Sequence, residues 1–439
     1  MEPTFSGSGY RLLHLGNPVN RQWAFQLARE ASLLRFKIVV CAIAVLLIEG
    51  RLDAADYTFH KLFDSTGNQA VLDLLPPQLD AAGGAYFNAE IDGEYDIVRA
   101  VPGSYSVVTS GLQFFMAVND PGDVVTYERL DNATNGRLNL ISSGVSSEVP
   151  LPTTEPFVLN YAAPGWSQFS TPLINNSLTV GYAGLVPPDL SSPTFALYTS
   201  SRPDEALVTT SDAGPMYSAG FFDQLIPANI GMNNQGDIFF SGTGPQGAGI
   251  FSVDENGVLT TRLLLADHPE LTYLAPQIVA NDNGSVLFAA LTNDGLGTIG
   301  LFELDASNQL HTQSPSLLDP RATYDLNNNG EIAYYREHIK DGIYTGPDAI
   351  ADKVIETGDV LDGETVTGLR FYRGLNDAGQ IAFQAYLGNG RWAVYRADPV
   401  AVPEPSTIAL ASVGTLAVLA HRLRRRRLAK DPQIAQNAA

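Results

Sequence analysis

One short stretch carries the side chains best suited to bind a metal ion. Asp325, Asn327 and Asn329 alternate along the chain ahead of Gly330, and oxygens spaced in this way before a turn glycine match the first half of an EF-hand calcium loop. The second half does not match, because the twelfth position is Arg336 instead of a bidentate glutamate. We therefore favour a plain Asn-Gly turn between strands, with a weak calcium site as the alternative.

Residues for other common chemistries are few. The one cysteine, Cys41, lies in an N-terminal apolar run, which excludes disulfides, thiolate catalysis and cysteine-bound metals from the rest of the chain. No G-x-S-x-G elbow, H-E-x-x-H pair or P-loop occurs. These absences favour a non-enzymatic protein, although Ser, Asp and His side chains could still converge in the fold. The histidines outside the two ends are His60, His268, His311 and His338.

The middle of the chain is strongly acidic. Residues 56–400 contain 14 lysines and arginines against 41 aspartates and glutamates, a net charge of −27. Such a surface repels nucleic acid and anionic lipid, so we expect no nucleic-acid partner. The acidity suits solubility outside the cell and permits weak capture of divalent cations, but an acidic protein without a cation site is the preferred interpretation.

A turn followed by a strand recurs in the second half of the chain. An asparagine begins each copy, a glycine stands three positions later, and Ile or Val then alternates with an aromatic residue. Asparagine and glycine tolerate the positive φ of a tight turn, and the alternation indicates one buried face of a strand. The copies are 48, 46 and 49 residues apart. The four turns contain Asn233 and Gly236, Asn281 and Gly284, Asn327 and Gly330, and Asn376 and Gly379.

Weaker copies extend the repeat toward the N-terminus. Residues 80–87 keep the turn and the aromatic residue, whereas residues 175–182 keep the alternation but have Leu178 in place of the glycine. Because leucine disfavours positive φ, we expect the Leu178 turn to take another form. The interval between these two copies leaves room for one more unit, for which residues 132–140 are the candidate. The total is seven units.

Units of this length predict an all-β fold, a β-propeller with seven blades. The coils of a β-helix would be shorter, and β-sandwich modules would be about twice as long. The last unit ends near Arg396 after two strands, whereas residues 57–75 resemble the second half of a unit. We therefore expect the first strands to pair with the last blade and close a ring, since an open array would expose sheet edges.

Aromatic residues are frequent in the last two units. They could offer stacking surfaces for sugar rings at the blade edges, and they are Tyr334, Tyr335, Tyr344, Tyr372, Tyr386, Trp392 and Tyr395. Most of these aromatic residues recur at strand spacing, and we interpret them as core. Tyr335 is the exception, because it is out of phase with Ile332 and Tyr334, and we expect it to face solvent.

The C-terminal segment combines three features. A Pro-Glu-Pro triplet is followed by an apolar run at residues 407–420 and then by a cluster of arginines. A helix over this run would be about 21 Å long, which is short for a bilayer core of roughly 30 Å, and the arginines would hold its C-terminal end in the cytoplasm. The residues are Val402, Pro403, Glu404 and Pro405 in the first feature and Arg422, Arg424, Arg425, Arg426 and Arg427 in the last.

This arrangement resembles the PEP-CTERM sorting signal of Gram-negative bacteria. The resemblance implies recognition by the membrane enzyme exosortase, transient anchoring in the inner membrane, and then display on the surface or release into the extracellular matrix. An ordinary membrane anchor with a stop-transfer cluster is the alternative. The repeats themselves resemble the NxxGxxAF repeats of bacterial surface proteins, many of which carry this same tail.

The N-terminal end agrees with export. Arg29, Arg35 and Lys37 precede the apolar run 38–48, and Ala54 and Ala55 follow it, as in a secretory signal peptide. An uncleaved signal anchor is the alternative. We therefore divide the chain into a signal helix with a long polar lead (1–55), the propeller domain (56–400), a sorting segment with a membrane helix (401–427) and a short tail (428–439).

The sequence thus predicts an exported, non-enzymatic protein whose repeat domain is structural or binds a carbohydrate or other ligand. A propeller enzyme acting on extracellular polysaccharide is the alternative. We expect exosortase as a partner, the membrane as a partner before processing, and extracellular polysaccharide as the ligand. We expect no cofactor apart from the weak calcium site.

Overall fold

The computed structural model describes residues 57–67, 69–71, 75–111, 113–129, 136–153, 172–186, 194–209, 214–215, 230–244, 246–314, 322–336 and 341–400. Ala54–Val400 form one compact unit. The expected signal helix and C-terminal membrane helix lie outside the described residues. Within those residues, no helix is long and apolar enough to cross a membrane.

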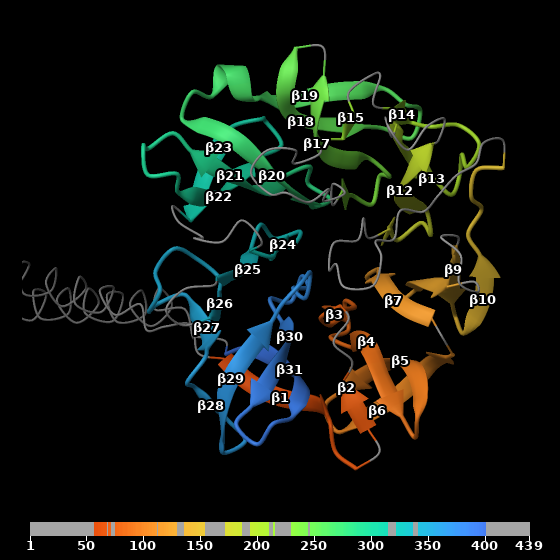
Figure 1. The fold of residues 1–439 in the computed structure, drawn as a ribbon, viewed down its shortest axis with the longest axis vertical. Coiled ribbons are helices and arrows are strands. Elements are labelled where there is room, and N and C mark those ends of the chain that lie inside the picture. The colour runs from red at the N-terminus through yellow and green to blue at the C-terminus, as the bar shows by residue number, and fades with distance from the viewer. Residues whose placement is uncertain are drawn as a thin grey trace, which may run out of the picture. The chain divides into compact units, whose positions relative to one another are not determined.

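Seven antiparallel sheets surround a central axis, as Figure 1 shows for the described residues. The prediction of an all-β, seven-bladed propeller is therefore confirmed. Blade 1 contains β2 (Gln69–Val71), β3 (Gln78–Leu79), β4 (Ala85–Ile91), β5 (Glu94–Val101) and β6 (Ser104–Ser110). Blade 2 contains β7 (Gln113–Val118), β8 (Val124–Arg129), β9 (Gly136–Ser142) and β10 (Val145–Glu148). Blade 3 contains β11 (Leu173–Ile174), β12 (Val180–Val186), β13 (Thr194–Thr199) and β14 (Val208–Thr209).

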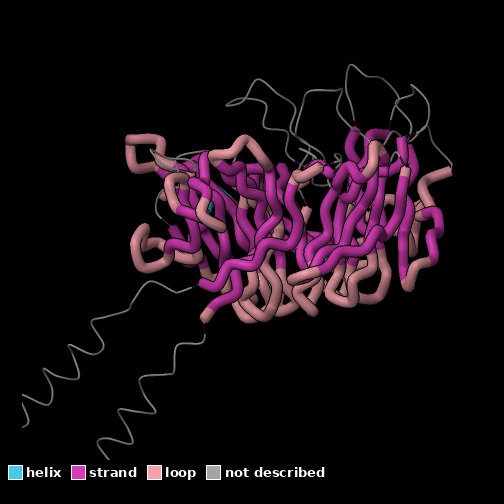
Figure 2. The backbone as a smooth tube through the Cα atoms, turned by 90° about the horizontal axis from the view of Figure 1, so that it is seen from below, coloured by secondary structure: helices cyan, strands magenta, loops and turns pink. Residues whose placement is uncertain are grey.

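The remaining blades follow the same plan, and Figure 2 shows their strands side by side, with turns at both ends. Blade 4 contains β15 (Gly214–Pro215), β16 (Gly231–Met232), β17 (Ile238–Gly244), β18 (Gly247–Val253) and β19 (Leu259–Leu264), and the short 3-10 helix η1 (Leu265–Asp267) follows it. Blade 5 contains β20 (Leu271–Ala280), β21 (Val286–Thr292), β22 (Ile299–Leu304) and β23 (Leu310–Ser314). Blade 6 contains β24 (Tyr324–Leu326), β25 (Ile332–Arg336), β26 (Gly342–Tyr344) and β27 (Lys353–Glu356).

Blade 7 joins the two ends of the repeat domain. It contains β28 (Val360–Leu361), β29 (Glu364–Arg370), β30 (Ile381–Leu387) and β31 (Trp392–Pro399), and its outer strand is β1 (Tyr57–Asp64) from the start of the domain. β1 pairs antiparallel with β31, from Tyr57 opposite Pro399 to Asp64 opposite Ala393. Closure of the ring is confirmed. Only β1 takes part in it, because β2 pairs with β4 of blade 1.

The core lies between the blades. Each junction between neighbouring blades holds one cluster of buried apolar side chains from the described residues. Successive side chains of a strand point to opposite faces, so Phe240 packs toward blade 3 and Phe239 toward blade 5. Both faces of the middle strands, such as β17, are therefore apolar, as in other sheets that are covered on both sides.

Aromatic residues of the repeat stack across the two middle strands of most blades. Ring centroids are 5.9 Å apart for Phe240 and Phe251, and the same pairing recurs in blades 3, 5, 6 and 7 at 5.8 to 6.0 Å. Such pairs add about 0.5 to 1.5 kcal/mol each beyond their buried area. The interpretation of the repeated aromatic residues as core is confirmed. It is wrong for Tyr386, which is exposed, and the expectation that Tyr335 faces solvent is wrong because Tyr335 packs against the apolar cluster between blades 6 and 7.

The turn of blade 2 is not where the sequence interpretation placed it. Asn119 begins that turn, its Oδ1 accepts the N–H of Asp123, and Gly122 has φ of 90°. The stretch 132–140 is wrong as a repeat start, because its described part belongs to β9, the third strand of the blade. Pro121 inside the turn and the short interval after Asp80 hide this copy from a search by spacing.

The Leu178 turn was also predicted incorrectly. Leu178 adopts φ of 64°, and its N–H binds the carbonyl of Asn175 just as the N–H of Gly330 binds that of Asn327. Asn175 Oδ1 accepts the N–H of Thr179, so the side-chain bond of the turn is present as well. The bonds of Asn175 therefore hold this turn in the same form as the glycine turns and impose a strained φ on Leu178. Leu178 is 38% exposed.

This strain predicts opposite effects of two substitutions. Leu178→Gly should raise the free energy of unfolding by about 0.5 to 1 kcal/mol, because glycine adopts positive φ without the cost that an L side chain has there. Gly330→Ala should lower it by about 1 kcal/mol, since Gly330 has φ of 79° and no atom within 4 Å of an added Cβ, which leaves strain as the main cost. Urea denaturation measures both.

Gly388→Ala is the matched control. Gly388 lies outside the repeat, its φ is not positive, and an added Cβ would make ordinary contacts of 3.5 Å or more. We expect no loss of stability there. A loss in Leu178→Gly would show that packing of the leucine side chain outweighs the strain of its backbone.

Candidate functional site: the central channel

The first residues of the seven turns form an inner ring around the channel. Each has at most 5% of its surface exposed. In Asn327, Oδ1 accepts the N–H groups of Asn329 and Glu331 at 3.0 and 2.9 Å, which shapes the turn. Its Nδ2 donates to the carbonyl of Asn376 in the next blade at 3.0 Å. The members of the inner ring are Asp80, Asn119, Asn175, Asn233, Asn281, Asn327 and Asn376.

Asparagine suits this position because one side chain carries both an acceptor for the turn and a donor for the neighbouring blade. The bond from Asn376 Nδ2 to the carbonyl of Asp80, at 3.1 Å, joins the last turn to the first. Asp80 has no side-chain donor, so the step to blade 2 uses the N–H of Ala81, which binds the carbonyl of Asp120 at 3.0 Å. The Asp80 carboxylate instead pairs with Arg99 at 2.7 Å.

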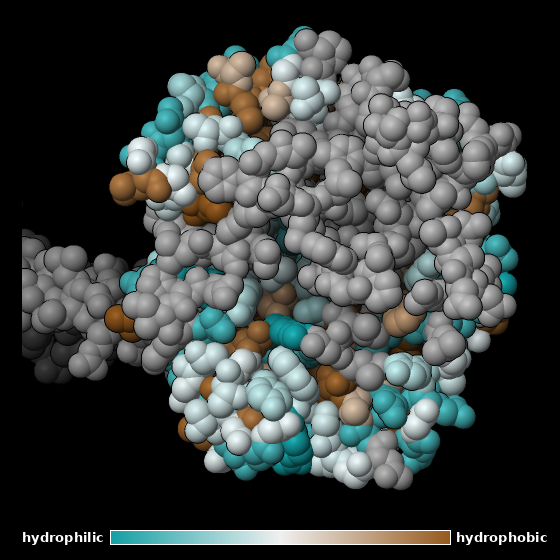
Figure 3. Space-filling model, in the orientation of Figure 1, coloured by the Kyte–Doolittle hydropathy of each residue, from teal (hydrophilic) through white to brown (hydrophobic). Residues whose placement is uncertain are grey.

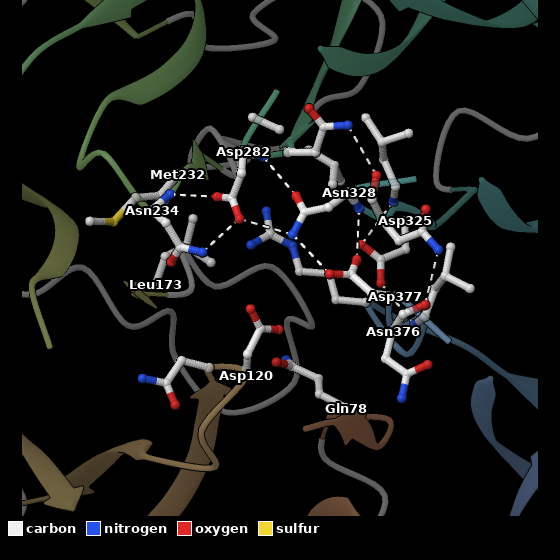
Figure 4. A pocket seen from close by; sticks show the side chains of 18 of the residues that line it. Gln78, Asp120, Leu173, Met232, Asn234, Asp282, Asp325, Asn328, Asn376 and Asp377 are labelled. Carbon is white, nitrogen blue, oxygen red and sulfur yellow. Dashed lines mark hydrogen bonds between the residues drawn. The ribbon is translucent and has the colours of Figure 1, made fainter. Parts of the chain in front are cut away.

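The next residue of six turns forms a second, more exposed ring, which we call the Asp–Asn belt. The side chain of each member after the first accepts a hydrogen bond from the backbone N–H of the preceding member, at 2.6 to 3.2 Å. Asn328 Nδ2 also lies 2.9 Å from Asp282 and 3.0 Å from Asp377, between their carboxylates. The belt is Asp120, Asn176, Asn234, Asp282, Asn328 and Asp377, and Figure 4 labels five of these six residues.

Inside the belt lies a cavity of about 170 Å³, lined by residues from all seven blades. Arg373 is the one basic residue among its described lining residues. Its Nη2 donates to the carbonyls of Ile230 and Ile278 at 2.6 and 3.0 Å, which joins blade 7 to blades 4 and 5 across the axis. The arginine therefore acts as a strut across the channel.

Asp325 is the buried carboxylate of the cavity. Its oxygens accept the N–H groups of Leu326 and Leu375 at 3.0 and 2.9 Å. Burial raises the pKa of Asp325 to about 6, although the bond from Leu375 and the charge of Arg373 oppose this rise. At neutral pH the Asp325 carboxylate is therefore charged although it is buried, which lowers the stability of the folded state.

The residues of the expected calcium loop bind separate partners. Asp325 binds two backbone N–H groups, Asn327 shapes the turn, and Asn329 Nδ2 donates to the carbonyl of Asp377 at 2.6 Å. No group of three or more His, Cys, Asp or Glu side chains among the described residues is placed to hold a metal ion. The calcium site stays a prediction.

The described histidines lie away from the channel. His60 in β1 is 3.3 Å from Asp398, and His311 in β23 is 3.0 Å from Asp305. His268, which follows η1, is 2.9 Å from Glu270. No histidine is among the described lining residues of the cavity, and His338 lies outside the described residues.

Sequence reasoning identified six of the seven turns but not the rings that they build. The signal for the belt was present, since the residue after the first turn position is Asp or Asn in six of the seven units. Arg373 belongs to no repeated position and gave no signal.

The C-terminal tail matches a known family model. Residues 401–427, which include Val402, Pro403, Glu404, Pro405 and the arginine cluster, match the family model of the PEP-CTERM protein-sorting motif. The tail is a PEP-CTERM motif. This confirms the interpretation made from the Pro-Glu-Pro triplet, the apolar run and the arginines. A PEP-CTERM motif is recognised by exosortase and implies export and sorting to the cell surface or the extracellular space. The likeness to NxxGxxAF repeats stays a prediction.

Similar solved structures include proteins that are named as propellers. The chain is 11% identical to YCF48 bound to a D1 peptide, with a TM-score of 0.38, over 80% of this chain and 99% of that one. It is 10% identical to the propeller domain of the Trilobed protease from Pyrococcus furiosus, with a TM-score of 0.41 and coverages of 78% and 96%. Puromycin hydrolase is 13% identical, with a TM-score of 0.42 and coverages of 78% and 53%. Each of these TM-scores is below 0.5. No curated protein matches the chain.

The position of Asn328 between two carboxylates predicts a strong effect of charge. Asn328→Asp removes the donor shared by Asp282 and Asp377 and adds a third negative charge, which should lower the free energy of unfolding by about 1 to 3 kcal/mol at pH 7. Urea denaturation at pH 7 tests this.

Asn389→Asp is the matched control for charge. Asn389 is exposed, and its Oδ1 accepts the N–H of Arg391 at 3.2 Å, a bond that aspartate can keep. We expect less than 0.5 kcal/mol of change there. Equal effects in the two variants would contradict the role of Asn328 as a bridge.

The raised pKa of Asp325 predicts a dependence of stability on pH. The folded protein keeps this proton up to about pH 6, whereas the unfolded chain releases it near pH 4, so the folded state loses stability as pH rises through that window. Between pH 4 and pH 8 the wild-type protein should lose about 2 kcal/mol more than Asp325→Asn does. If the free energy of unfolding depends on pH in the same way in both proteins, the raised pKa of Asp325 is contradicted.

Proposed function

We propose that this chain is an exported, non-enzymatic protein of the cell surface or extracellular matrix, whose propeller binds carbohydrate. In this proposal the PEP-CTERM tail anchors the protein in the inner membrane through the run 407–420 until exosortase processes it. The propeller is the part that remains outside the cell. Its net charge of −27 keeps it soluble there and disfavours polyanionic partners.

The use of polar groups in the channel carries the proposal. The belt carboxylates accept backbone and asparagine donors, and Arg373 binds two carbonyls, so these groups hold the ring together. Among the described lining residues no histidine stands ready as a general base. The cavity of about 170 Å³ is also smaller than the 300 to 1,000 Å³ of ordinary ligand pockets. These features support a structural role for the channel residues, which join the blades, over a role as an active site.

One observation favours the alternative, an enzyme acting on extracellular polysaccharide. Asp325 lines the cavity, and its pKa of about 6 suits a general acid near neutral pH. Its two bonds to backbone N–H groups and its burial argue against this role, because a proton donor must reach the bond that it cleaves.

A binding and product assay separates the two functions. The full-length protein in detergent is incubated with cellohexaose, laminarihexaose, chitohexaose and xylohexaose, and binding is measured by calorimetry and products by mass spectrometry. We expect at least one hexaose to bind and to remain intact. Cleavage that Asp325→Asn abolishes would support the enzyme, and absence of binding to all four sugars would contradict the proposal.

The sorting step has its own prediction. Glu404→Ala, or replacement of Arg424, Arg425, Arg426 and Arg427 by glutamine, should leave export intact but trap unprocessed protein in the membrane. The propeller and the signal segment are unchanged in both variants. Cell fractionation and mass measurement of the protein decide, and normal mass with normal release in both would leave only an ordinary anchor.

A further inference from the structure

An aromatic pair on blade 7 departs from the repeat. Tyr386 is the one exposed residue of β30, at 37%, while the other six residues of that strand are buried. Its ring lies 5.1 Å from that of Trp392, its register partner in β31, at an interplanar angle of 41°. Tyr386 belongs to none of the core clusters of the described residues, so its ring does not serve to pack the core.

The corresponding positions of other blades lack such a pair. Counting three residues beyond the repeated aromatic residue, blade 5 has Leu291 opposite Ile299 and blade 4 has Thr243 opposite Ala248. Blade 1 has Glu90 opposite Tyr95. The strands form and pair in all these blades with different residues at this position. The propeller fold therefore does not require the pair.

Contacts of Trp392 with the core and with Arg370 hold the pair in a fixed orientation. Trp392 packs against the cluster of apolar residues between blades 7 and 1. The guanidinium of Arg370 from β29 lies 4.7 Å from the centre of the Trp392 ring. Three adjacent strands thus position the two rings, and a rigid aromatic surface loses little entropy when a ligand binds to it.

A second exposed tyrosine stands on the neighbouring blade. Tyr105 in β6 is 42% exposed, its ring lies 5.3 Å from that of Phe63, and its hydroxyl accepts a hydrogen bond from Gln69 at 2.8 Å. Phe63 belongs to the same core cluster as the one on which Trp392 packs. Exposed tyrosines therefore flank the junction at which the ring closes.

The size and charge of this surface indicate the kind of ligand. A few partly exposed rings offer on the order of 200 Å², far less than the roughly 800 Å² that a stable protein interface buries on each partner. On the face that Figure 3 draws, hydrophobic residues among the described ones stand in small groups between hydrophilic ones. The acidic domain repels anionic lipid and nucleic acid. A neutral sugar fits, because the C–H face of a pyranose ring packs on an aromatic ring while its hydroxyls meet polar groups at the edge.

We propose that Tyr386 and Trp392 form a stacking subsite for a neutral pyranose of an extracellular polysaccharide. This inference rests on the proposed carbohydrate-binding function and names its site. Tyr386 supplies the outer ring, Trp392 and Arg370 hold it, and Tyr105 contacts a sugar further along the chain on blade 1.

Calorimetry with the four hexaoses and the full-length protein tests the subsite. Tyr386→Ala and Tyr386→Leu should each weaken binding of the recognised sugar at least tenfold, because leucine keeps apolar bulk but lacks an aromatic face. Tyr95→Ala, which removes an exposed tyrosine from the corresponding register pair of blade 1, should change it less than twofold. Quenching of tryptophan fluorescence by the sugar should be lost in Trp392→Phe.

The outcomes separate this inference from the proposed function. Normal binding by both Tyr386 variants would overturn the subsite and leave carbohydrate binding in place. Failure of the wild-type protein to bind any of the four sugars would overturn both. Equal weakening in Tyr386→Ala and Tyr95→Ala would also overturn the subsite, because it would show a general effect of lost surface tyrosines.

Discussion

The pairing of β1 with β31 is the interaction on which the rest of the molecule depends. It places the first strand of the domain on the outside of the last blade, so that every blade has a neighbour on both sides. Leu62 and Phe63 of β1 belong to the cluster between blades 7 and 1, and the bond from Asn376 to Asp80 joins the inner ring at the same junction. Without this pairing β31 would be an open edge, which proteins avoid.

The channel follows from that closure. Once seven turns face one axis, asparagines such as Asn281 and Asn327 bind the turn of their own blade and a carbonyl of the next. The mixture of Asp and Asn in the belt suits this arrangement, since carboxylates only accept hydrogen bonds and need amide donors beside them. Most of the polar side chains described at the axis thereby bind other parts of the ring, although Arg373 Nε is buried there without a hydrogen-bond partner.

Features that repeat could be predicted from the sequence, and so could the closure of the ring, because the repeat is out of phase at its two ends. Single side chains that act outside the repeat could not. The turns at Asn233, Asn281, Asn327 and Asn376 and the buried aromatic residues were readable because the same local physics acts in each copy. Leu178 was misjudged because the bonds of Asn175 outweigh the preference of leucine. Asn119 was missed because its spacing is irregular. The strut Arg373 and the exposure of Tyr386 depend on how distant blades face each other, which no local pattern encodes.

Closure of the ring is the central claim, and a disulfide across it is the most direct test. Thr58 and Asp398 are register partners in β1 and β31, and opposite residues of antiparallel strands have Cα atoms about 4.5 to 5.5 Å apart, within the range that a disulfide spans. In a Cys41→Ser background, Thr58→Cys with Asp398→Cys should form an intramolecular disulfide under mild oxidation. The oxidised form should have a free energy of unfolding about 2 to 5 kcal/mol above that of the reduced form of the same variant, a comparison that cancels the loss of the ion pair between Asp398 and Arg396. Thiols that stay reduced, or that link two molecules instead, would contradict a ring closed by these two strands.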